Sequence, residues 1–163
     1  EMALKDKDDN IRGMALRIAR QHKLDVIGLI KQLADEESAL VRRECLVAIR
    51  HNKSKEAPAL WAKLANAHDG KDRWYLEALG LAADKQENKF FDAWVRGAKL
   101  NTAAARDIIW RNRGTHGAKF LADIVLDEKT TEAEKPRYLR ALDFIPKGKE
   151  KDDALARIAL GAL

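Results

Sequence analysis

The chain has 163 residues, of which 46% are hydrophobic and 6% aromatic, with only nine glycines and three prolines. This length suffices for one domain with a sizeable core, and the abundance of Ala and Leu favours packed helices over a β-sandwich or barrel. The 31 Lys and Arg outnumber the 26 Asp and Glu, which permits contact with nucleic acid or an acidic partner, but acids and bases alternate along most of the chain, as on an ordinary solvated surface. No apolar run approaches the roughly 20 residues of a membrane span.

The first half of the chain is predicted to be a series of short helices. Residues 1–6 read as the end of an earlier helix, and the chain ends in ALARIALGAL, so we interpret it as a piece of a longer protein. The expected helices run to about residue 21 after the caps Asp8, Asp9 and Asn10, and over 26–35 after Asp25, 39–51 after Ser38, and 57–67 with Pro58 in the first turn. The first helix should carry Ile11, Met14, Ala15, Ile18 and Ala19 on one side. The apolar residues expected on the others are Leu29, Ile30, Leu33, Val41, Cys45, Leu46, Ile49, Leu60, Trp61 and Leu64.

The second half continues in the same way from a central helix over 71–84, which follows the Asp69-Gly70 turn. Helices are expected over 88–98, 103–112 after Thr102, 117–127, 132–144 and 151–162. Thr131 and Glu134 have the spacing of a capping box for the fifth of these six. The apolar residues expected on them are Phe90, Phe91, Trp94, Val95, Ile108, Ile109, Trp110, Phe120, Leu121, Ile124, Val125, Leu155, Ile158 and Ala159.

Two interleaved series of helices repeat along the chain. Positions 11, 15, 16 and 19 recur 30 residues later, and we map Cys45 to Tyr75 and Ile49 to Leu79 at the same offset. The stretch around Tyr75 and Leu79 returns 63 residues later at 138–142, and the alternate helices repeat at Leu33, Leu64, Trp94, Ile124 and Ile158. Because one such hairpin cannot bury its faces alone, this pattern predicts a single all-α domain over 1–163, in which antiparallel hairpins stack into an α-solenoid.

Two short sequence patterns resemble the HEAT repeat. Ile11-Arg12 and Val41-Arg42 look like the Val-Arg near the start of its second helix, and Ala78-Leu79-Gly80 looks like the Ala-Leu-Gly near its end. The resemblance implies about five HEAT-like hairpins in a right-handed superhelix.

A narrower resemblance rests on DGKDRWYLEALGLAAD with KFFDAWV, then ARDIIWRNRG, then RYLRALDFI, within residues 69–145. Together they resemble the HEAT-repeat region of large multidomain bacterial proteins of the Planctomycetes type, described as membrane-bound dehydrogenases or haem-binding proteins. The resemblance implies an extracytoplasmic, periplasmic location, a dehydrogenase-like propeller before the repeats and a cytochrome c domain after them. It implies no catalytic residue, cofactor or metal here, and no CxxCH haem-attachment motif is present.

For each residue that could take part in metal binding, catalysis or ligand binding, we favour a structural role. His22, His51, His68 and His116 lack the spacing of a metal site, and Cys45 lies on an apolar helix face, as a buried cysteine does. The segment 114–119 opens a helix and could hold an anion, but a plain turn is favoured, and Asp69-Gly70 is expected to be a turn and cap rather than a calcium loop. Trp61 and Trp94 are expected in the core. Trp74 is also favoured as core, although it sits beside the inward row and could stack on a base or sugar.

Two functions remain open at this stage. The first is a non-catalytic scaffold that binds protein, either its flanking domains or another chain, and spaces the dehydrogenase-like domain from the cytochrome. The alternative is a nucleic-acid-binding protein akin to the alkylpurine DNA glycosylases, in which Trp74 and Asp72 would be tested first. Arg20, Arg50 and Arg111 align in a broken basic column, which favours phosphate tracking only weakly and fits pairing with acids of the next repeat. The candidate interaction surface is Arg12, Arg20, Arg42, Arg43, Arg50, Lys71, Arg73, Trp74 and Arg111.

Overall fold

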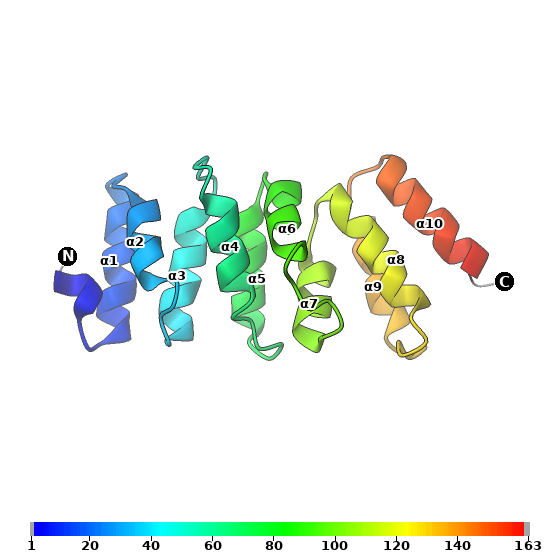
Figure 1. Ribbon diagram of the computed structural model, residues 1–163, viewed down its shortest axis with the longest axis horizontal. Coiled ribbons are helices and arrows are strands. Elements are labelled where there is room, and N and C mark those ends of the chain that lie inside the picture. The colour runs from blue at the N-terminus through cyan, green and yellow to red at the C-terminus, as the bar shows by residue number, and fades with distance from the viewer. Residues whose placement is uncertain (1, 162–163) are drawn as a thin grey trace.

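The computed structural model describes residues 2–161, and within that range the chain is all-α (Figure 1). Ten α-helices and two short 3-10 helices follow one another across these residues. Their bounds are η1 Met2–Lys5, α1 Asp9–Gln21, α2 Val26–Leu33, α3 Ala39–Ile49, α4 Ala57–Ala65, α5 Arg73–Ala83, α6 Glu87–Val95, α7 Ala103–Arg111, η2 Thr115–Gly117, α8 Ala118–Leu126, α9 Lys135–Asp143 and α10 Lys149–Gly161. None of the helices over residues 2–161 combines the length and apolar character needed to cross a lipid bilayer.

The helices stand in two rows, and the chain passes between the rows at turns that alternate between the two long edges of the molecule in Figure 1. The first row consists of α1, α3, α5, α7 and α9, and each of these contacts the next. The second row consists of α2, α4, α6, α8 and α10. In it α2 packs on α4, α4 on α6 and α8 on α10, while α6 meets η2, which also contacts α8.

Side-chain caps mark the beginning of α1, α3, α5 and α7 in the first row. Asp8, Ser38, Asp72 and Thr102 are N-caps whose side chains accept hydrogen bonds from backbone N–H groups of the first turn, which satisfies donors that the helix itself leaves free. The caps of α1, α3, α5 and α7 are separated by 30, 34 and 30 residues. Each row position therefore has a defined equivalent in the next helix.

The constant offset of 30 predicted from the sequence is wrong between α3 and α5. The caps make Cys45 equivalent to Leu79, and Val41 equivalent to Tyr75. The left-handed residues after these two helices, His51 and Lys85, are also 34 apart. The error has a simple cause, because a slip of four residues moves an apolar helix face by about one turn and leaves its pattern almost unchanged. The extra residues lie in the longer connections 50–56 and 66–72.

The core lies between the two rows, and buried Trp and Tyr side chains donate hydrogen bonds across it. The indole N–H of Trp61 in α4 donates to the Leu79 carbonyl in α5 at 3.0 Å, and the Tyr75 hydroxyl donates to the Leu64 carbonyl at 2.8 Å. Both bonds join a first-row helix to a second-row helix and satisfy polar atoms that would otherwise be costly to bury. Trp61 and Trp94 are buried as predicted, and so is Cys45.

The predicted burial fails mainly on the end helices. In α1 the buried residues are Gly13, Leu16 and Ala19, whereas Ile11, Met14 and Ile18 are exposed because they face away from α2 and α3. In α10 only Ala154 is buried, Leu155 and Ala159 are exposed and Ile158 is partly buried. Elsewhere Leu29, Val95, Trp110 and Phe120 are partly rather than fully buried. An end helix has a neighbour on one side only, so its pattern overstates the buried face.

The start of α9 also differs from the prediction. Glu134 accepts hydrogen bonds from the Thr131 backbone N–H and hydroxyl, but residues 132–134 form a turn and the helix begins at Lys135. Only half of the capping box is formed, because the Thr131 hydroxyl is directed to Glu134 and not to a backbone N–H.

Candidate binding groove on the first helix row

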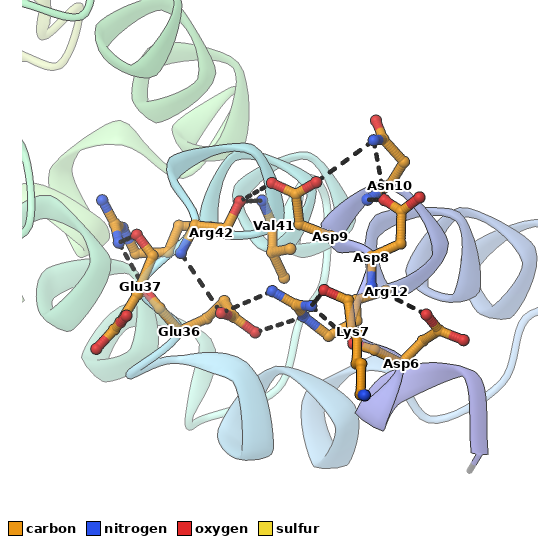
Figure 2. Close-up of polar contacts among 11 residues, drawn as sticks. Asp6, Lys7, Asp8, Asp9, Asn10, Arg12, Glu36, Glu37, Val41 and Arg42 are labelled. Atoms are coloured by element: carbon orange, nitrogen blue, oxygen red, sulfur yellow. Dashed lines mark hydrogen bonds and ion pairs between the residues drawn. The ribbon is translucent and has the colours of Figure 1, made fainter.

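Two arginines of the predicted interaction surface brace the turns of the first row. Arg12 donates from Nε and Nη2 to the Glu36 carboxylate at 2.8 and 3.0 Å, and from Nη1 to the carbonyls of Asp6 and Lys7 (Figure 2). Arg42, its equivalent in α3, donates to the carbonyls of Glu36 and Glu37 at 2.6 and 2.8 Å. Both side chains hold the segment that leads into their own helix, although the buried Nε of Arg42 has no hydrogen-bond partner among the described residues.

Most of the other predicted surface arginines pair with a neighbouring first-row helix or its cap. Arg43 pairs with Asp72 at 3.0 Å, Arg50 with Asp84 at 2.7 Å and Arg111 with Glu77 at 2.8 Å. These contacts form a ladder of ion pairs between neighbouring first-row helices, as one interpretation of the arginines in the sequence predicted. The basic column is corrected in one respect: Arg20 and Arg50 each lie twelve residues after their cap, but Arg111 lies nine after Thr102.

The remaining predicted residues are open to solvent. Arg20, Lys71 and Arg73 are exposed, and Arg73 pairs with Glu77 one turn along α5. Trp74 is 73% exposed, so the preference for a core position was wrong. It occupies the second position of α5, where its equivalent Leu40 in α3 packs close to Gly13. The exposed indole does not line the groove described next.

A groove opens over α5, α7 and α9, and we call it the arginine–tryptophan groove. It encloses about 450 Å³. Its lining residues are Arg73, Glu77, Trp110, Arg111, Arg113, Arg137, Arg140, Ala141 and Phe144. Five guanidinium groups thus surround a single carboxylate, two aromatic rings and one alanine.

Three of the five guanidinium groups of the groove lie over its aromatic rings. Arg137 lies 4.5 Å from the centre of the Trp110 ring, and Arg73 and Arg113 each lie 5.9 Å from it. Arg113 also lies 4.8 Å from the centre of the Phe144 ring. Such cation–π contacts restrict the movement of a guanidinium group, which keeps the N–H donors that are not used within the protein available to an anion.

The carboxylates near the groove compensate only part of its charge. Glu77 accepts hydrogen bonds from both Arg73 and Arg111, and although burial opposes ionisation, these bonds hold the pKa of Glu77 below its usual value. Asp107 accepts from Arg137 at 2.6 Å. Among the residues that the structure describes, Arg113 and Arg140 have no carboxylate partner. Burial and the nearby Arg111 lower the pKa of Arg113.

A second pocket adjoins the groove at the turn before α5. It encloses about 340 Å³ and shares Arg73, Trp110 and Arg137 with the groove. The His68 ring lies on one wall, stacked on Tyr75 at 5.9 Å, and its Nε2 lies 3.8 Å from Asp107. His68 is therefore a buried part of the pocket lining, and both of its ring nitrogens lack a hydrogen-bond partner among the described residues.

The other chemical candidates are structural. Within residues 2–161 no group of three His, Cys, Asp or Glu side chains converges as a metal site would. His51 and His116 each contact a single carboxylate, Asp84 and Asp92, at 2.9 and 2.8 Å. Asp69 accepts from the N–H groups of Lys71 and Asp72, and Gly70 is left-handed with φ of 77°, so this segment is the predicted turn. The segment from Gly114 forms η2 before α8.

Sequence reasoning missed the residues that make the groove. It singled out Arg73 and Arg111 but not Arg113, Arg137 or Arg140. A signal was present, because arginines three residues apart lie on one helix face, as Arg137 and Arg140 do. The sequence pattern could not predict that α9 packs on α7 with Arg137 over the Trp110 ring.

No family model, no curated protein and no solved structure matches the chain. The resemblance of its sequence segments to multidomain bacterial proteins therefore stays a prediction. The proposed function is based on the geometry of the groove.

Proposed function

We propose that the chain is a HEAT-like α-solenoid of about five antiparallel hairpins that acts as a non-catalytic scaffold and binds protein through the arginine–tryptophan groove. The successive contacts α1–α3–α5–α7–α9 support the stacked-hairpin description. The observation that carries the binding role is the excess of guanidinium groups in one groove, which is lined by five arginines and a single carboxylate, Glu77. Solubility alone does not require arginines to be held over aromatic rings, whereas binding of a partner benefits from side chains that are already positioned.

The make-up of the groove suits binding better than catalysis. Its lining offers guanidinium groups and rings, and its one carboxylate, Glu77, is engaged by two arginines and has a lowered pKa. A general base needs a pKa near the working pH and a free lone pair toward its substrate. Aromatic and arginine side chains often carry most of the binding energy of a protein interface, and the groove combines the partly buried Trp110 with several arginines.

Nucleic-acid binding is the second candidate, and the exposed Trp74 favours it, since an open indole can stack on a base. Two observations favour protein instead. The Trp110 ring is occupied by Arg73, Arg113 and Arg137. Along α1 and α3, most of the arginines are engaged by carboxylates or carbonyls, so they do not form a continuous row of unpaired cations that could track a phosphate backbone.

The place of the chain between a dehydrogenase-like domain and a cytochrome domain, outside the cytoplasm, is proposed from the resemblance alone. A stiff spacer would raise the effective concentration of its flanking domains for one another. Reading the parent gene on both sides of the segment tests this proposal. A propeller upstream and a CxxCH motif downstream would support it, whereas unrelated flanking domains would remove it.

The binding role is tested by selecting displayed random peptides on the chain and counter-selecting on the Arg140→Glu variant. Arg140 is exposed and has no ion pair with the described residues, so the variant should fold normally. Peptides that bind the native chain and not the variant support a protein-binding groove. A selection that returns only variant-tolerant peptides, together with tight binding of a DNA duplex at about 50 mM salt, would favour the nucleic-acid function instead.

A further inference from the structure

The chemistry of the groove also restricts its partner, and the restriction begins with Arg113. This side chain donates from Nη1 to the carbonyls of Trp110 and Asn112 at 2.9 and 3.0 Å and stacks on Phe144. Two bonds and a ring contact hold the guanidinium group in one orientation before any ligand arrives. It is partly buried and meets no carboxylate among the described residues, so an arriving anion gains a charge-assisted bond at little cost in side-chain order.

Arg140 supplies a second open cation from the facing helix. It lines the same groove from α9, whereas Arg113 reaches it from the end of α7. The two groups therefore approach the 450 Å³ space from different elements. Planar guanidinium groups bind carboxylates through paired N–H donors, and the protein already uses this pairing at Arg12 and Glu36.

The rest of the lining favours a ligand that is apolar as well as anionic. Phe144 is 56% exposed and, with Ala141, gives the groove an apolar wall. The lining residues include no serine, threonine or glycine whose hydroxyl or open amide would cradle a phosphate. A ligand that combines carboxylates with an apolar side chain fits both walls.

The size of the groove suggests an extended ligand. Neighbouring packed helices lie roughly 8–10 Å apart, so three first-row helices span about 20 Å. An extended peptide covers this distance with about six residues at roughly 3.3 Å each.

We infer that the groove binds an acidic, extended peptide segment of a partner protein, whose carboxylates are held by Arg113 and Arg140 and whose apolar side chain rests on Phe144. This inference depends on the proposed function, because it names the class of partner for the same groove.

The test uses fluorescence anisotropy on the full chain with a labelled peptide of about eight residues that alternates Glu with Leu. The matched probes are the same peptide with Gln in place of Glu and an oligothymidylate of similar length. Arg140→Glu should weaken binding of the Glu peptide at least about tenfold, because attraction becomes repulsion. Arg113→Lys keeps the charge but loses the planar fork, and it should weaken binding severalfold. Arg96→Glu makes the same charge change on the second row and should leave binding unchanged.

The outcomes distinguish binding of an acidic peptide from the more general protein-binding function. Preference for the Glu peptide, lost in Arg140→Glu and kept in Arg96→Glu, supports it. Equal binding of the Gln peptide, or tighter binding of oligothymidylate, overturns it. If the display selection returns groove-dependent peptides without acidic residues, the acidic partner is wrong while the protein-binding function stands. If no groove-dependent peptide is found at all, both are wrong.

Discussion

Arg12 in α1 and Glu36, which lies three residues after the end of α2, form a bidentate pair whose side chains are only 14% and 16% exposed. The same guanidinium group also ties the carbonyls of Asp6 and Lys7 (Figure 2). One side chain thus joins the entry to α1 with the connection between α2 and α3. The pair is a structural brace at the start of the two rows.

Replacing Arg12 with Gln should destabilise the fold by about 2–3 kcal/mol, because a partly buried carboxylate and two carbonyls lose their donors. Thermal unfolding should then shift down by roughly 5–10 °C for a domain of this size. Arg17→Gln is the control, since Arg17 also pairs with a glutamate, Glu44, but is 56% exposed, and its loss should cost less than about 1 kcal/mol. Equal losses in the two variants would contradict the role of burial.

The Arg12–Glu36 pair should also contribute to loss of stability in acid. The hydrogen bond from Arg12 holds the pKa of Glu36 below its usual value of 4.5. A carboxylate with a lowered folded pKa contributes stability that is complete above the unfolded pKa and is lost as the pH falls through the folded pKa. The fall in melting temperature between about pH 5 and pH 3 should therefore be smaller in Glu36→Gln than in the native chain.

Exposed Glu37 provides the control for this acid effect, because Glu37→Gln changes the same charge next to the pair without touching Arg12. An identical acid profile for Glu36→Gln and the native chain would show that this pair does not contribute to it. Part of the acid effect should persist in every variant, since hydrogen bonds also lower the pKa of Asp8, Asp69 and Asp84.

The sequence predicted the helices well because caps and apolar periodicity are local. Ser38, Asp72 and Thr102 each cap the helix expected of them, and the expected core tryptophans Trp61 and Trp94 are buried. Alignment between repeats was less certain, because an apolar face looks the same after a slip of one turn. The four-residue error between α3 and α5 arose in this way.

The candidate site was predicted poorly for a different reason. Whether an arginine is free depends on which carboxylate the neighbouring helix brings to it, and this is a tertiary property. Arg43 and Arg111 cannot be told from Arg113 and Arg140 by sequence. The first two pair with Asp72 and Glu77, whereas the last two face the groove without a carboxylate among the described residues.

Charged substitutions of two leucines in α5 should have very different effects on the free energy of unfolding, because one leucine is buried and the other is exposed. Leu79 is 1% exposed and Leu81 is 45% exposed. Leu79→Asp places an unpaired charge in the core and should cost at least about 3–5 kcal/mol, enough to abolish cooperative unfolding. Leu81→Asp should change stability by less than about 1 kcal/mol. Circular dichroism during urea titration measures both, and a folded, cooperative Leu79→Asp variant would show that the packing of α5 is misassigned.

Cys45, the only cysteine, should report on the same packing through its chemical reactivity. Its side chain is fully buried between α3 and its neighbours, and burial raises the pKa of the thiol to about 12. Because the thiolate is the reactive form, a folded chain at about pH 8 should react with a disulfide reagent orders of magnitude more slowly than a free thiol. Reaction should accelerate in urea along the same transition as the loss of helix, and Leu79→Asp should react rapidly without urea. Fast labelling of the native chain would mean that α3 opens locally well below the global unfolding free energy, and the core between the two rows would then be less cooperative than its burial indicates.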